Sequence, residues 1–521
     1  MSSRLPRMLK SAVQRRANSS TTAATSACPF HKTREEPGLK GSPRPLKPFK
    51  SVPAPRGLPL VGTALSLIMS GGAAKIHEYC DRRHRELGPI FRERLGAVDA
   101  VIVSKKDYIQ RIYLGEGKHP VHMVPEPWLI YNQQKGIKRG LFFMDGSQWL
   151  DRRRTLNQAL MNQREVAKHG PAFNEIVTDL THRWEKLSRR SPDGVIPNLE
   201  RELYNWSIET LGTMVFGRRL GCVLQPSEGD HTMHKFVDYV QQIFVESSKL
   251  SIIPPKLAVS MNLPVWQRFV YAADNALSLA RKYAETRISE VQKSRESGII
   301  VPGVLNSLLA EKDVTHDEIV NIVADLILAA ADTTSHATQW ALHLLAKNPQ
   351  SQEQFHQQIR SVVKPNETLT DEHLDKIPYA KWIIKETLRL YPIATFLTRV
   401  LPQRIVLEDY EIPAGKLFVM SQYTAGRDEE TFPNPHSFVP ERWERDSALK
   451  DGATNACLPF GLGARACIGR RVAELKMRLL LARVVQKFHL ESANEKEVEI
   501  ALRLITTPDQ PIKLRLKKRT T

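Results

Sequence analysis

The stretch FGLGARACIG, from Phe460 to Gly469, decides how this chain is expected to fold. A single thiol, Cys467, stands among glycines and other small residues, and Arg465 precedes it by two positions. A thiolate is the nucleophilic and metal-binding form of cysteine, and nearby cations or a metal ion stabilise it. Glycines permit tight turns and let the backbone approach a large, flat group. The stretch therefore indicates a thiolate site on a loop without bulky side chains, with an ordinary structural turn as the alternative.

Charged residues at helical spacing accompany this loop. In KETLRLYP, Glu386 and Arg389 stand three positions apart, so they lie on one face of a predicted helix and can form an ion pair. Arg442, in FVPERW, lies between that helix and the cysteine loop along the chain. In WLDRRR, Trp149 and Arg153 stand four positions apart, again on one helical face. Each pair alone would be typical of an ordinary exposed helix.

Residues 315–347 are predicted to form one long helix. Thr315 and Glu318 have the spacing of a capping box at its start, and an Asn-Pro pair ends it. At the usual rise per residue such a helix is roughly 48 Å long, enough to cross a whole domain. Asp332 and Thr333 interrupt its apolar middle. A carboxylate inside a buried helix is costly unless it has partners or a function.

Composition and patterning set the fold class. The chain has 521 residues, 41% of them hydrophobic, and a net charge of +19. Helical patterns dominate from about residue 150 to residue 350, and residues 91–104 and 393–418 alternate as short strands do. Because strands and helices do not alternate regularly, we predict a mainly α fold with minor β. The five scattered cysteines indicate a reducing compartment.

The N-terminal segment differs from the rest. Residues 1–34 contain seven basic side chains and no acidic one, which is typical of a mitochondrial transit peptide, although a disordered basic tail is the alternative. Its apolar residues fall on one helical face: Leu5, Met8, Leu9, Ala12 and Val13. Residues 35–62 are predicted to form a proline-rich linker, and residues 63–521 a single domain. No apolar run of about 18 residues occurs near the start, so an N-terminal membrane anchor is not expected.

Together, these motifs resemble those of the cytochrome P-450 monooxygenases, from about residue 53 onward. The family pattern Phe-x-x-Gly-x-Arg-x-Cys-x-Gly is matched by Phe460, Gly463, Arg465, Cys467 and Gly469. The resemblance implies the P-450 fold, in which haem lies between a long central helix and the loop that carries the cysteine ligand. It also implies that residues 63–521 form one catalytic domain.

The resemblance implies a role for each motif. Cys467 would be the axial thiolate ligand of the iron of haem b. The residues that would hold the haem, mainly through its propionates, are Trp149, Arg153, Arg399, Phe460 and Arg465. A structural charge network would consist of Glu386, Arg389 and Arg442. Guanidinium groups suit carboxylates because they donate two parallel hydrogen bonds.

Asp332 and Thr333 match the acid–alcohol pair that relays protons to dioxygen in this family. The reaction implied is hydroxylation of an unactivated C–H bond, with O2 as co-substrate. Electrons would come from NADPH through ferredoxin reductase and a ferredoxin. Ala330 stands where the family often has glycine, which leaves the efficiency of oxygen activation open.

The resemblance to mitochondrial members implies docking of a small acidic ferredoxin on a basic surface. The matching positions are Lys381, Lys385, Arg470 and Arg471. Opposite charge speeds association and fixes orientation, although a solvated helix face is the alternative. We expect a peripheral protein on the matrix side of the mitochondrial inner membrane, without a nucleic-acid partner.

The substrate is expected to be a lipophilic steroid. The predicted pocket lining is apolar with few polar groups and comes from residues 122–141, the middle of the long helix, residues 393–397 and residues 505–507. The segment EPWLIYNQQKGIKRGLFFMDGSQWL resembles arthropod ecdysteroid-synthesising hydroxylases, the 2-hydroxylase above all. Another ecdysteroid carbon, another sterol or a xenobiotic remain alternatives. Residues 251–266 are apolar and proline-broken, as suits either a membrane contact or a packed loop.

Two activities of a different class stay open. One is a haem-thiolate isomerase, which does not use O2, and the other is a haem-binding sensor without turnover. Asp332 and Thr333 argue against the isomerase, because such enzymes can dispense with a proton relay.

Overall fold

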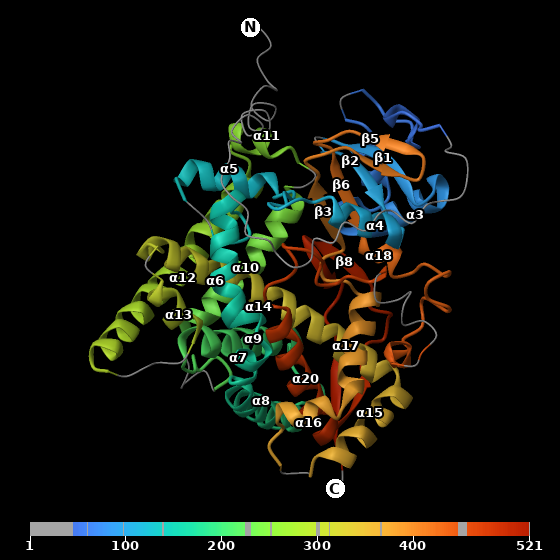
Figure 1. Cartoon of the computed structure of the whole chain (residues 1–521). Helices are drawn as coiled ribbons and strands as arrows, with labels where there is room; N and C mark the ends of the chain where they lie inside the picture. The colour runs from blue at the N-terminus through green and yellow to red at the C-terminus, as the bar shows by residue number, and fades with distance from the viewer. Residues whose placement is uncertain are drawn as a thin grey trace, which may run out of the picture.

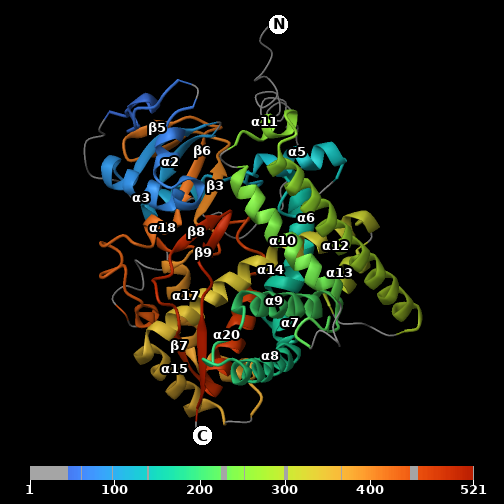
Figure 2. The ribbon, with the colours of Figure 1, turned by 180° about the vertical axis from the view of Figure 1, so that it is seen from behind.

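The computed structural model describes residues 45–519 apart from short gaps, at residues 60, 97, 138–139, 225–230, 251–252, 299–302, 312, 365–366, 446 and 448–455. The predicted transit peptide and the first part of the predicted linker lie outside the described residues. Figure 1 shows a large helical body that carries a smaller part, built around a β-sheet, at one corner, and Figure 2 shows the same arrangement from behind.

The main sheet joins distant parts of the chain. Its strand order is β1 (Ile90–Leu95), β2 (Val98–Val103), β6 (Leu417–Ser421) and β3 (Phe396–Val400). β2 and β6 run parallel, and the other neighbouring strands are antiparallel. Both segments that alternate in the sequence therefore form strands. The sequence pattern does not predict that these two segments share one sheet.

The remaining described elements are small sheets and many helices. The two-stranded sheets are β4 (Ile405–Leu407) with β5 (Tyr410–Ile412), β7 (Phe488–Ser492) with β10 (Leu514–Lys518), and β8 (Ile500–Arg503) with β9 (Ile505–Pro508). The helices are η1 (Phe49–Ser51), α2 (Ala64–Met69), η2 (Gly72–Lys75), α3 (Ile76–Leu87), α4 (Lys106–Leu114), α5 (Glu126–Lys135), α6 (Gly146–Met161), α7 (Gln163–Ala167), α8 (Gly170–Arg190), α9 (Leu199–Phe216), α10 (His231–Lys249), α11 (Pro255–Ser260), α12 (Pro264–Glu296), α13 (Val304–Ala310), α14 (His316–Lys347), α15 (Pro349–Val362), α16 (Asp371–Asp375), α17 (Pro378–Leu390), α18 (Gln422–Ala425), η3 (Pro440–Trp443) and α20 (Arg470–Lys487). The prediction of a mainly α fold with minor β is confirmed. Among the described helices, none combines the length and the apolar character needed to cross a membrane.

The predicted long helix is α14. Its capping box is confirmed, because the Glu318 backbone N–H donates to the Thr315 hydroxyl at 3.2 Å and the Glu318 carboxylate accepts from the Thr315 backbone N–H at 3.1 Å. Most of its residues beyond the first turn are buried. α9 and α12 pack against it, and it lies in the middle of the helical body in Figure 1. The helix therefore forms the centre of the core.

The described part of the predicted linker lies against the sheet. Val52 is 2% exposed and belongs to the same buried cluster as Phe418 of β6. The backbone of Lys47 pairs with Tyr410 of β5. Prolines keep this segment free of α-helix, as expected, but its contacts attach it to the folded body rather than leaving it as a spacer.

Candidate active site

The loop that carries Cys467 is closed by its own backbone. The Cys467 N–H donates to the carbonyl of Phe460 at 2.7 Å, and Gly463 adopts a left-handed φ of +77°. A Cβ atom at Gly463 would lie 2.0 Å from Oε1 of Glu116. That same oxygen accepts from the Ala464 N–H at 3.0 Å. Glycine is therefore needed at position 463 because a carboxylate from the end of α4 supports the loop.

Cys467 precedes α20 directly and lies beside α6. Burial raises the pKa of its thiol, whereas the backbone N–H of Gly469 and the guanidinium of Arg153 lower it. The residue nevertheless keeps exposed surface. Ala329, in the middle of the otherwise buried α14, is exposed as well. A sulfur that is surrounded by protein and still accessible is suited to metal ligation, since a metal ion stabilises the thiolate.

Arg465 is held in place by the loops before α5 and α6. Its guanidinium lies 4.3 Å from the centre of the Trp149 ring. It donates to the carbonyls of Pro120 and Met144, both at 2.6 Å, and to Oδ1 of Asp145 at 2.7 Å. The predicted neighbours Arg465 and Trp149 therefore stack, and the guanidinium cannot rotate freely.

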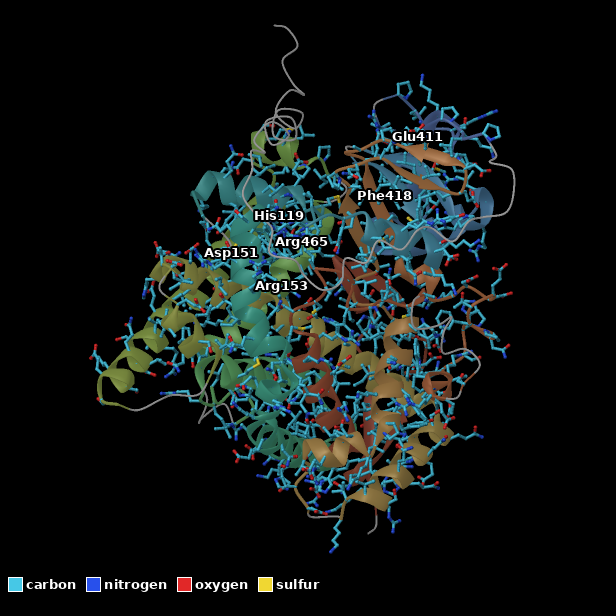
Figure 3. The ribbon with its side chains drawn as sticks, viewed as in Figure 1. His119, Asp151, Arg153, Glu411, Phe418 and Arg465 are labelled. Carbon is cyan, nitrogen blue, oxygen red and sulfur yellow. The ribbon has the colours of Figure 1, made fainter. Side chains whose placement is uncertain are left out.

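Arg399 and Arg153 bring further positive charge to the same loop. Arg399, in β3, donates to Oε2 of Glu116 at 2.5 Å. Arg153, in α6, donates to the carbonyl of Ala466 at 2.6 Å. Figure 3 shows Arg153 and Arg465 near one another in the middle of the molecule. The predicted haem-binding arginines thus gather around the cysteine loop from three separate elements.

The electrostatics of this cluster fit a bound dianion. Burial lowers the pKa of Arg465 to about 10; Asp145 opposes the shift, and Arg399 and Arg153 add to it. His122 is half-buried, and neither of its two buried ring nitrogens has a hydrogen-bond partner in the part of the chain that the structure describes. Burial, Arg465 and Arg399 lower its pKa to about 4. Carboxylates such as the propionates of haem would neutralise the charges of these guanidinium groups and accept a hydrogen bond from His122.

Glu386, Arg389 and Arg442 form the network that the sequence predicts. Arg389 donates to both carboxylate oxygens of Glu386, at 2.7 and 2.9 Å, and the side chains of both residues are 0% exposed. Arg442 adds a bond to Glu386 at 3.2 Å, and the Trp443 indole adds another at 3.0 Å. Arg389 also donates to the carbonyls of residues 426, 435 and 437. The network ties α17 to η3 and to the segment before it.

Asp332 and Thr333 share α14 but have separate partners. Asp332 is 2% exposed, and its Oδ2 has no hydrogen-bond partner among the described residues. Burial raises its pKa to about 6. The Thr333 hydroxyl donates to the carbonyl of Ala329 at 2.7 Å. The acid and the alcohol are therefore adjacent along the helix without bonding each other.

Ala330, the departure from the family pattern, has a partner on α9. The Ser207 hydroxyl donates to the Ala330 carbonyl at 2.9 Å, and the Lys476 ammonium donates to the Ser207 oxygen at 3.0 Å. Lys476 is 1% exposed, and burial lowers its pKa to about 7. This chain of bonds links α20 to the middle of α14 through α9.

The predicted docking residues lie on one surface. Lys381, Arg470 and Arg471 are exposed, and Lys385 is half-buried with its ammonium 5.1 Å from the Trp443 ring. Burial lowers the pKa of Lys385, and the charges of Arg470 and Lys381 lower it further. Arg470 forms an ion pair with Glu474 at 3.0 Å. Lys381 and Arg470 are therefore close enough to act on Lys385, and Arg471 follows Arg470 directly.

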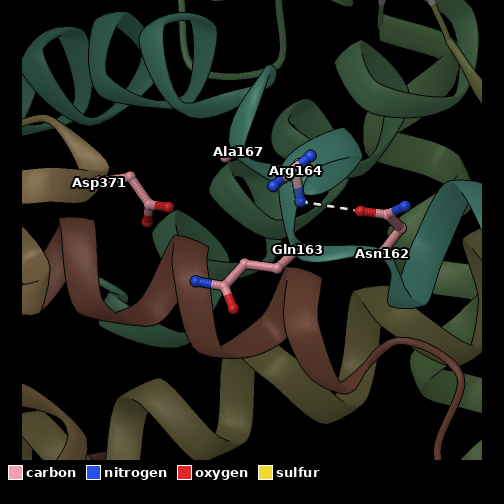
Figure 4. Close-up of a pocket in the computed structure, with 5 residues that line it drawn as sticks. All are labelled: Asn162, Gln163, Arg164, Ala167 and Asp371. Carbon is pink, nitrogen blue, oxygen red and sulfur yellow. Dashed lines mark hydrogen bonds between the residues drawn. The ribbon is translucent and has the colours of Figure 1, made fainter.

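A hollow of about 550 Å³ lies beside this basic surface, between α7 and α16 (Figure 4). Its lining residues are Asn162, Gln163, Arg164, Ala167 and Asp371. The Asn162 side chain accepts from the Arg164 backbone N–H at 2.9 Å and caps α7. A second hollow shares Gln163 and Asp371 and is also lined by Lys381 and Arg471. The surface around the docking residues is thus concave rather than flat.

Comparison with known families decides the assignment. The profile of the family described as Cytochrome P450 matches residues 52–516. This chain is a cytochrome P450. A solved structure described as retinoic acid bound cyanobacterial CYP120A1 shares the fold, with a TM-score of 0.73 and 21% identity over 90% of this chain and 99% of that one.

Three relatives at higher identity have names that describe them as mitochondrial. "Cytochrome P450 315a1, mitochondrial" of Drosophila melanogaster is 36% identical over 91% of this chain and 90% of its own length. "Sterol 26-hydroxylase, mitochondrial" of Rattus norvegicus is 31% identical over 94% of this chain and 92% of its own. "1,25-dihydroxyvitamin D(3) 24-hydroxylase, mitochondrial" of the same organism is 30% identical over 90% and 89%.

Membership in this family confirms several predictions. The P-450 fold, haem b, O2 and electrons from NADPH through partner proteins are properties of this cytochrome P450. The protein is a haem-thiolate monooxygenase. The roles of individual residues remain predictions, which the geometry above makes specific.

Two residues of this site were missed from the sequence. Glu116 bonds Arg399 and Ala464, from which it is separated by 283 and 348 positions. His122 was placed only in the predicted pocket lining, not among the groups that hold the cofactor. No local spacing marks either residue, since their neighbours come from other elements. Glu116 stands just after α4, and an acidic residue beyond the end of a helix is too common a pattern to indicate such a contact.

Proposed function

We propose that this cytochrome P450 is a mitochondrial steroid hydroxylase and that its substrate is an ecdysteroid precursor, hydroxylated at C2. The observation that carries the steroid assignment is similarity over about nine-tenths of the chain to a sterol 26-hydroxylase and a vitamin D 24-hydroxylase. The relative from Drosophila melanogaster at 36% identity supports a mitochondrial enzyme of the arthropod type. The resemblance of residues 126–150 to ecdysteroid hydroxylases favours C2.

Segments predicted to line the pocket are joined by buried contacts. The hydroxyls of Thr395 and Thr506 lie 2.8 Å apart, and both side chains are buried. The Thr506 N–H donates to the Ile393 carbonyl at 3.0 Å. At the other predicted wall, the rings of His122 and Phe142 make an edge contact at 4.8 Å. The two hydroxyls satisfy each other and leave few free polar groups at this wall, which supports a site for a large hydrophobic substrate.

Haem, when bound, supplies oxygen activation and the oxidation of the C–H bond. Cys467 would hold the iron through Sγ. Arg465, Arg399 and His122 would bind the propionates, and Trp149 fixes the plane of Arg465 by stacking. Arg153 supports the loop through Ala466 and stabilises the Cys467 thiolate by its charge. Phe460 anchors the loop through its carbonyl.

Asp332 and Thr333 supply protons on the α14 side. Burial keeps the pKa of Asp332 at about 6, close to the working pH, which is the condition for efficient proton transfer. Its Oδ2 has no partner among the described side chains and can therefore take up and release a proton without breaking a bond. Thr333 Oγ1 presents a hydroxyl beside the accessible Ala329.

Lys381, Lys385, Arg470 and Arg471 form the docking surface for an acidic ferredoxin. Three of them are exposed, and Arg470 follows the cysteine loop directly, so this surface lies a short distance from Cys467. Positive charge on it accelerates association with an acidic partner and orients it. The adjoining hollows give the surface a concave shape that a small protein can fill.

We also assign the protein to the matrix side of the mitochondrial inner membrane, bound peripherally. Apolar side chains are exposed on two short helices: Leu65, Ile68 and Met69 on α2, and Leu257 on α11, with Met261 just beyond it. Both helices lie in the upper part of Figure 2. Exposed apolar residues gathered on one side support contact with a lipid surface, from which a steroid would enter.

The decisive experiment reconstitutes the enzyme with ferredoxin, ferredoxin reductase and NADPH. Ecdysteroid precursors that lack the C2 hydroxyl are incubated with it, next to cholesterol and a vitamin D sterol. We expect NADPH consumption that needs all the components, and a C2-hydroxylated product by mass spectrometry and NMR. Hydroxylation at another position, or turnover of the vertebrate sterols alone, would reject the C2 assignment.

A further inference from the structure

Asp332 lies too deep to exchange protons with water directly. Its side chain is 3% exposed. The role proposed for it above requires a fresh proton in every cycle. A buried carboxylate can meet that demand only through neighbours that carry protons inward from the surface. The question is therefore which groups connect Asp332 with solvent.

His336 lies one turn further along α14 and faces two carboxylates. Its Nδ1 is 3.0 Å from the carbonyl oxygen of Asp332 and 3.6 Å from Asp332 Oδ1. Its Nε2 is 3.6 Å from Oε1 of Glu200, at the start of α9. The His336 side chain is 4% exposed, whereas that of Glu200 is 36% exposed. The three side chains therefore form a line from the interior to the surface.

The contacts of His336 favour a proton shared with Glu200, whose Oε1 lies 3.6 Å from Nε2. A carbonyl oxygen can only accept, so Nδ1 of His336 carries a hydrogen and donates to Asp332. A neutral ring would then present a bare Nε2 to a carboxylate, two acceptors facing each other. Either the ring is an imidazolium or Glu200 is protonated. His336 and Glu200 thus hold one exchangeable proton between them.

Residues from neighbouring elements contact His336 and Glu200 without separating them. The edge of Tyr204, one turn beyond Glu200 on α9, packs on the His336 ring at 5.8 Å. Gln241, from α10, donates to Glu200 at 3.1 Å, and Arg503, from β8, acts on Glu200 by its charge. Among the residues that the structure describes, Tyr204 and Arg503 are titratable groups that face the line from the elements packed around it.

The charges of His336 and the two carboxylates act on one another. Burial lowers the pKa of His336, but Asp332 and Glu200 outweigh it and raise the pKa above its usual value. Burial raises the pKa of Glu200, but His336 and Arg503 outweigh it and lower the pKa. The protonation states of His336, Glu200 and Asp332 therefore depend on one another.

We propose that Glu200, His336 and Asp332 form the pathway by which protons from solvent reach the oxygen-activating site. Glu200 takes a proton from water and passes it to Nε2 of His336. His336 then releases the proton on Nδ1 to a carboxylate oxygen of Asp332. The neutral ring now carries its hydrogen on Nε2, and it returns to the Nδ1–H tautomer before the next transfer. Only protons move, so no oxidant or reductant is needed. The pathway rests on the role proposed for Asp332, and it adds His336 and Glu200 as groups that act through Asp332.

The first test compares two histidines on one helix. His336→Gln keeps the size and hydrogen bonding of the side chain but cannot exchange a proton. His343→Gln is the matched control, because His343 is also buried on α14 and neither of its ring nitrogens has a partner among the described residues. We expect His336→Gln alone to increase peroxide release per product roughly tenfold and to raise the solvent isotope effect on product formation. The effect should stay below the ~10²-fold of a direct acid–base group, because water can partly replace the ring.

The second test does not depend on turnover. Histidine NMR of the diamagnetic ferrous carbon monoxide complex should show His336 titrating above the usual value of about 6.5. Glu200→Gln and Asp332→Asn should each lower that pKa, and Glu200→Asp should restore part of the shift. A titration that neither substitution moves would reject the contacts on which the pathway depends.

The outcomes separate this pathway from the role of Asp332 itself. If Asp332→Asn uncouples the enzyme and both His336→Gln and Glu200→Gln leave coupling unchanged, the pathway is wrong and the proposed role of Asp332 stands. If Asp332→Asn leaves coupling unchanged, that role and the pathway both fail. Uncoupling by His343→Gln to the same degree would show a general effect of substitutions in α14 and would also overturn the pathway.

Discussion

Glu386 in α17 and Asp332 in α14 are both buried carboxylates, and their surroundings are opposite. Glu386 is 0% exposed and accepts hydrogen bonds from Arg389, Arg442 and Trp443. Asp332 is 2% exposed, and its Oδ2 has no partner among the residues described. One carboxylate is saturated with donors, whereas the other keeps an oxygen that is free to bind a proton.

The difference separates a structural charge from a functional one. A buried ion that is fully paired holds one protonation state, and its donors hold the surrounding segments in one arrangement. A buried acid without donors is tuned by desolvation, which raises the pKa of Asp332 to about 6. α14 therefore carries Asp332, the carboxylate that can change its charge. Glu386 and its arginine partners keep their charges.

Cys467→Ser should have the largest effect. Replacing the thiolate by a weakly binding hydroxyl should abolish monooxygenase activity and remove the carbon monoxide difference band of thiolate-ligated haem. The matched control is Cys457→Ser, ten positions earlier in the same segment. A variant of Cys467 that keeps the band would show that another residue holds the iron.

Glu386→Gln tests the saturated carboxylate. The change leaves Arg389 and Arg442 buried without a counter-charge, which typically costs about 3–5 kcal/mol. We expect a matching loss in the free energy of unfolding and poor retention of haem, both measured on the purified holoenzyme by denaturant titration and absorbance. A stability close to that of wild type would contradict a structural role for the network.

Asp332→Asn tests the carboxylate that keeps an unpaired oxygen. We expect it to raise the free energy of unfolding, whereas Glu386→Gln lowers it. The pKa of about 6 exceeds the value of about 3.9 in an unfolded chain, so the contribution of Asp332 to stability is complete below about pH 4 and is lost as the pH rises through 6. The amide avoids that loss. Relative to wild type, the variant should therefore gain up to about 3 kcal/mol between pH 4 and pH 7.

Denaturant titrations of both proteins at several pH values measure this difference. A stability difference that does not change with pH would contradict the raised pKa of Asp332. Product formation per NADPH should fall in the same variant, although its haem content should equal that of wild type.

Lys381→Gln combined with Lys385→Gln should have the smallest effect on the protein itself. Because the two lysines supply charge to the docking surface, we expect ferredoxin binding to weaken about tenfold at low salt and to depend less on ionic strength. The fold and the haem spectrum should not change. Lys282→Gln with Lys293→Gln, at exposed positions of α12, is the control pair. Equal weakening by both pairs would indicate an unspecific charge effect.

The sequence predicts those parts of the site whose partners are local. The Thr315–Glu318 capping box and the Glu386–Arg389 pair each join residues three positions apart, and helical periodicity reveals such contacts. The cysteine loop is recognised because its glycines and thiol are contiguous. These features were enough to predict the fold class, the family and the cofactor.

Contacts between distant segments were not predictable in the same way. The bond from Glu116 to Ala464, the pairing of Thr395 with Thr506 and the parallel pairing of β2 with β6 bring together segments that carry no common pattern. His336 also escaped notice, because its meaning depends on Glu200, which stands on another helix. Local spacing identifies helices and motifs, whereas contacts between polar groups of distant segments depend on the tertiary structure.

The support of the cysteine loop by Glu116 has a consequence for biogenesis. The loop lies 348 positions after the carboxylate that holds it, so it can adopt its final shape only when almost the entire polypeptide is present. Contacts between such remote segments form slowly, since a large loss of chain entropy precedes them. Cofactor insertion should therefore be among the last steps of maturation, and truncation of the C-terminal fifth should leave a chain unable to retain porphyrin.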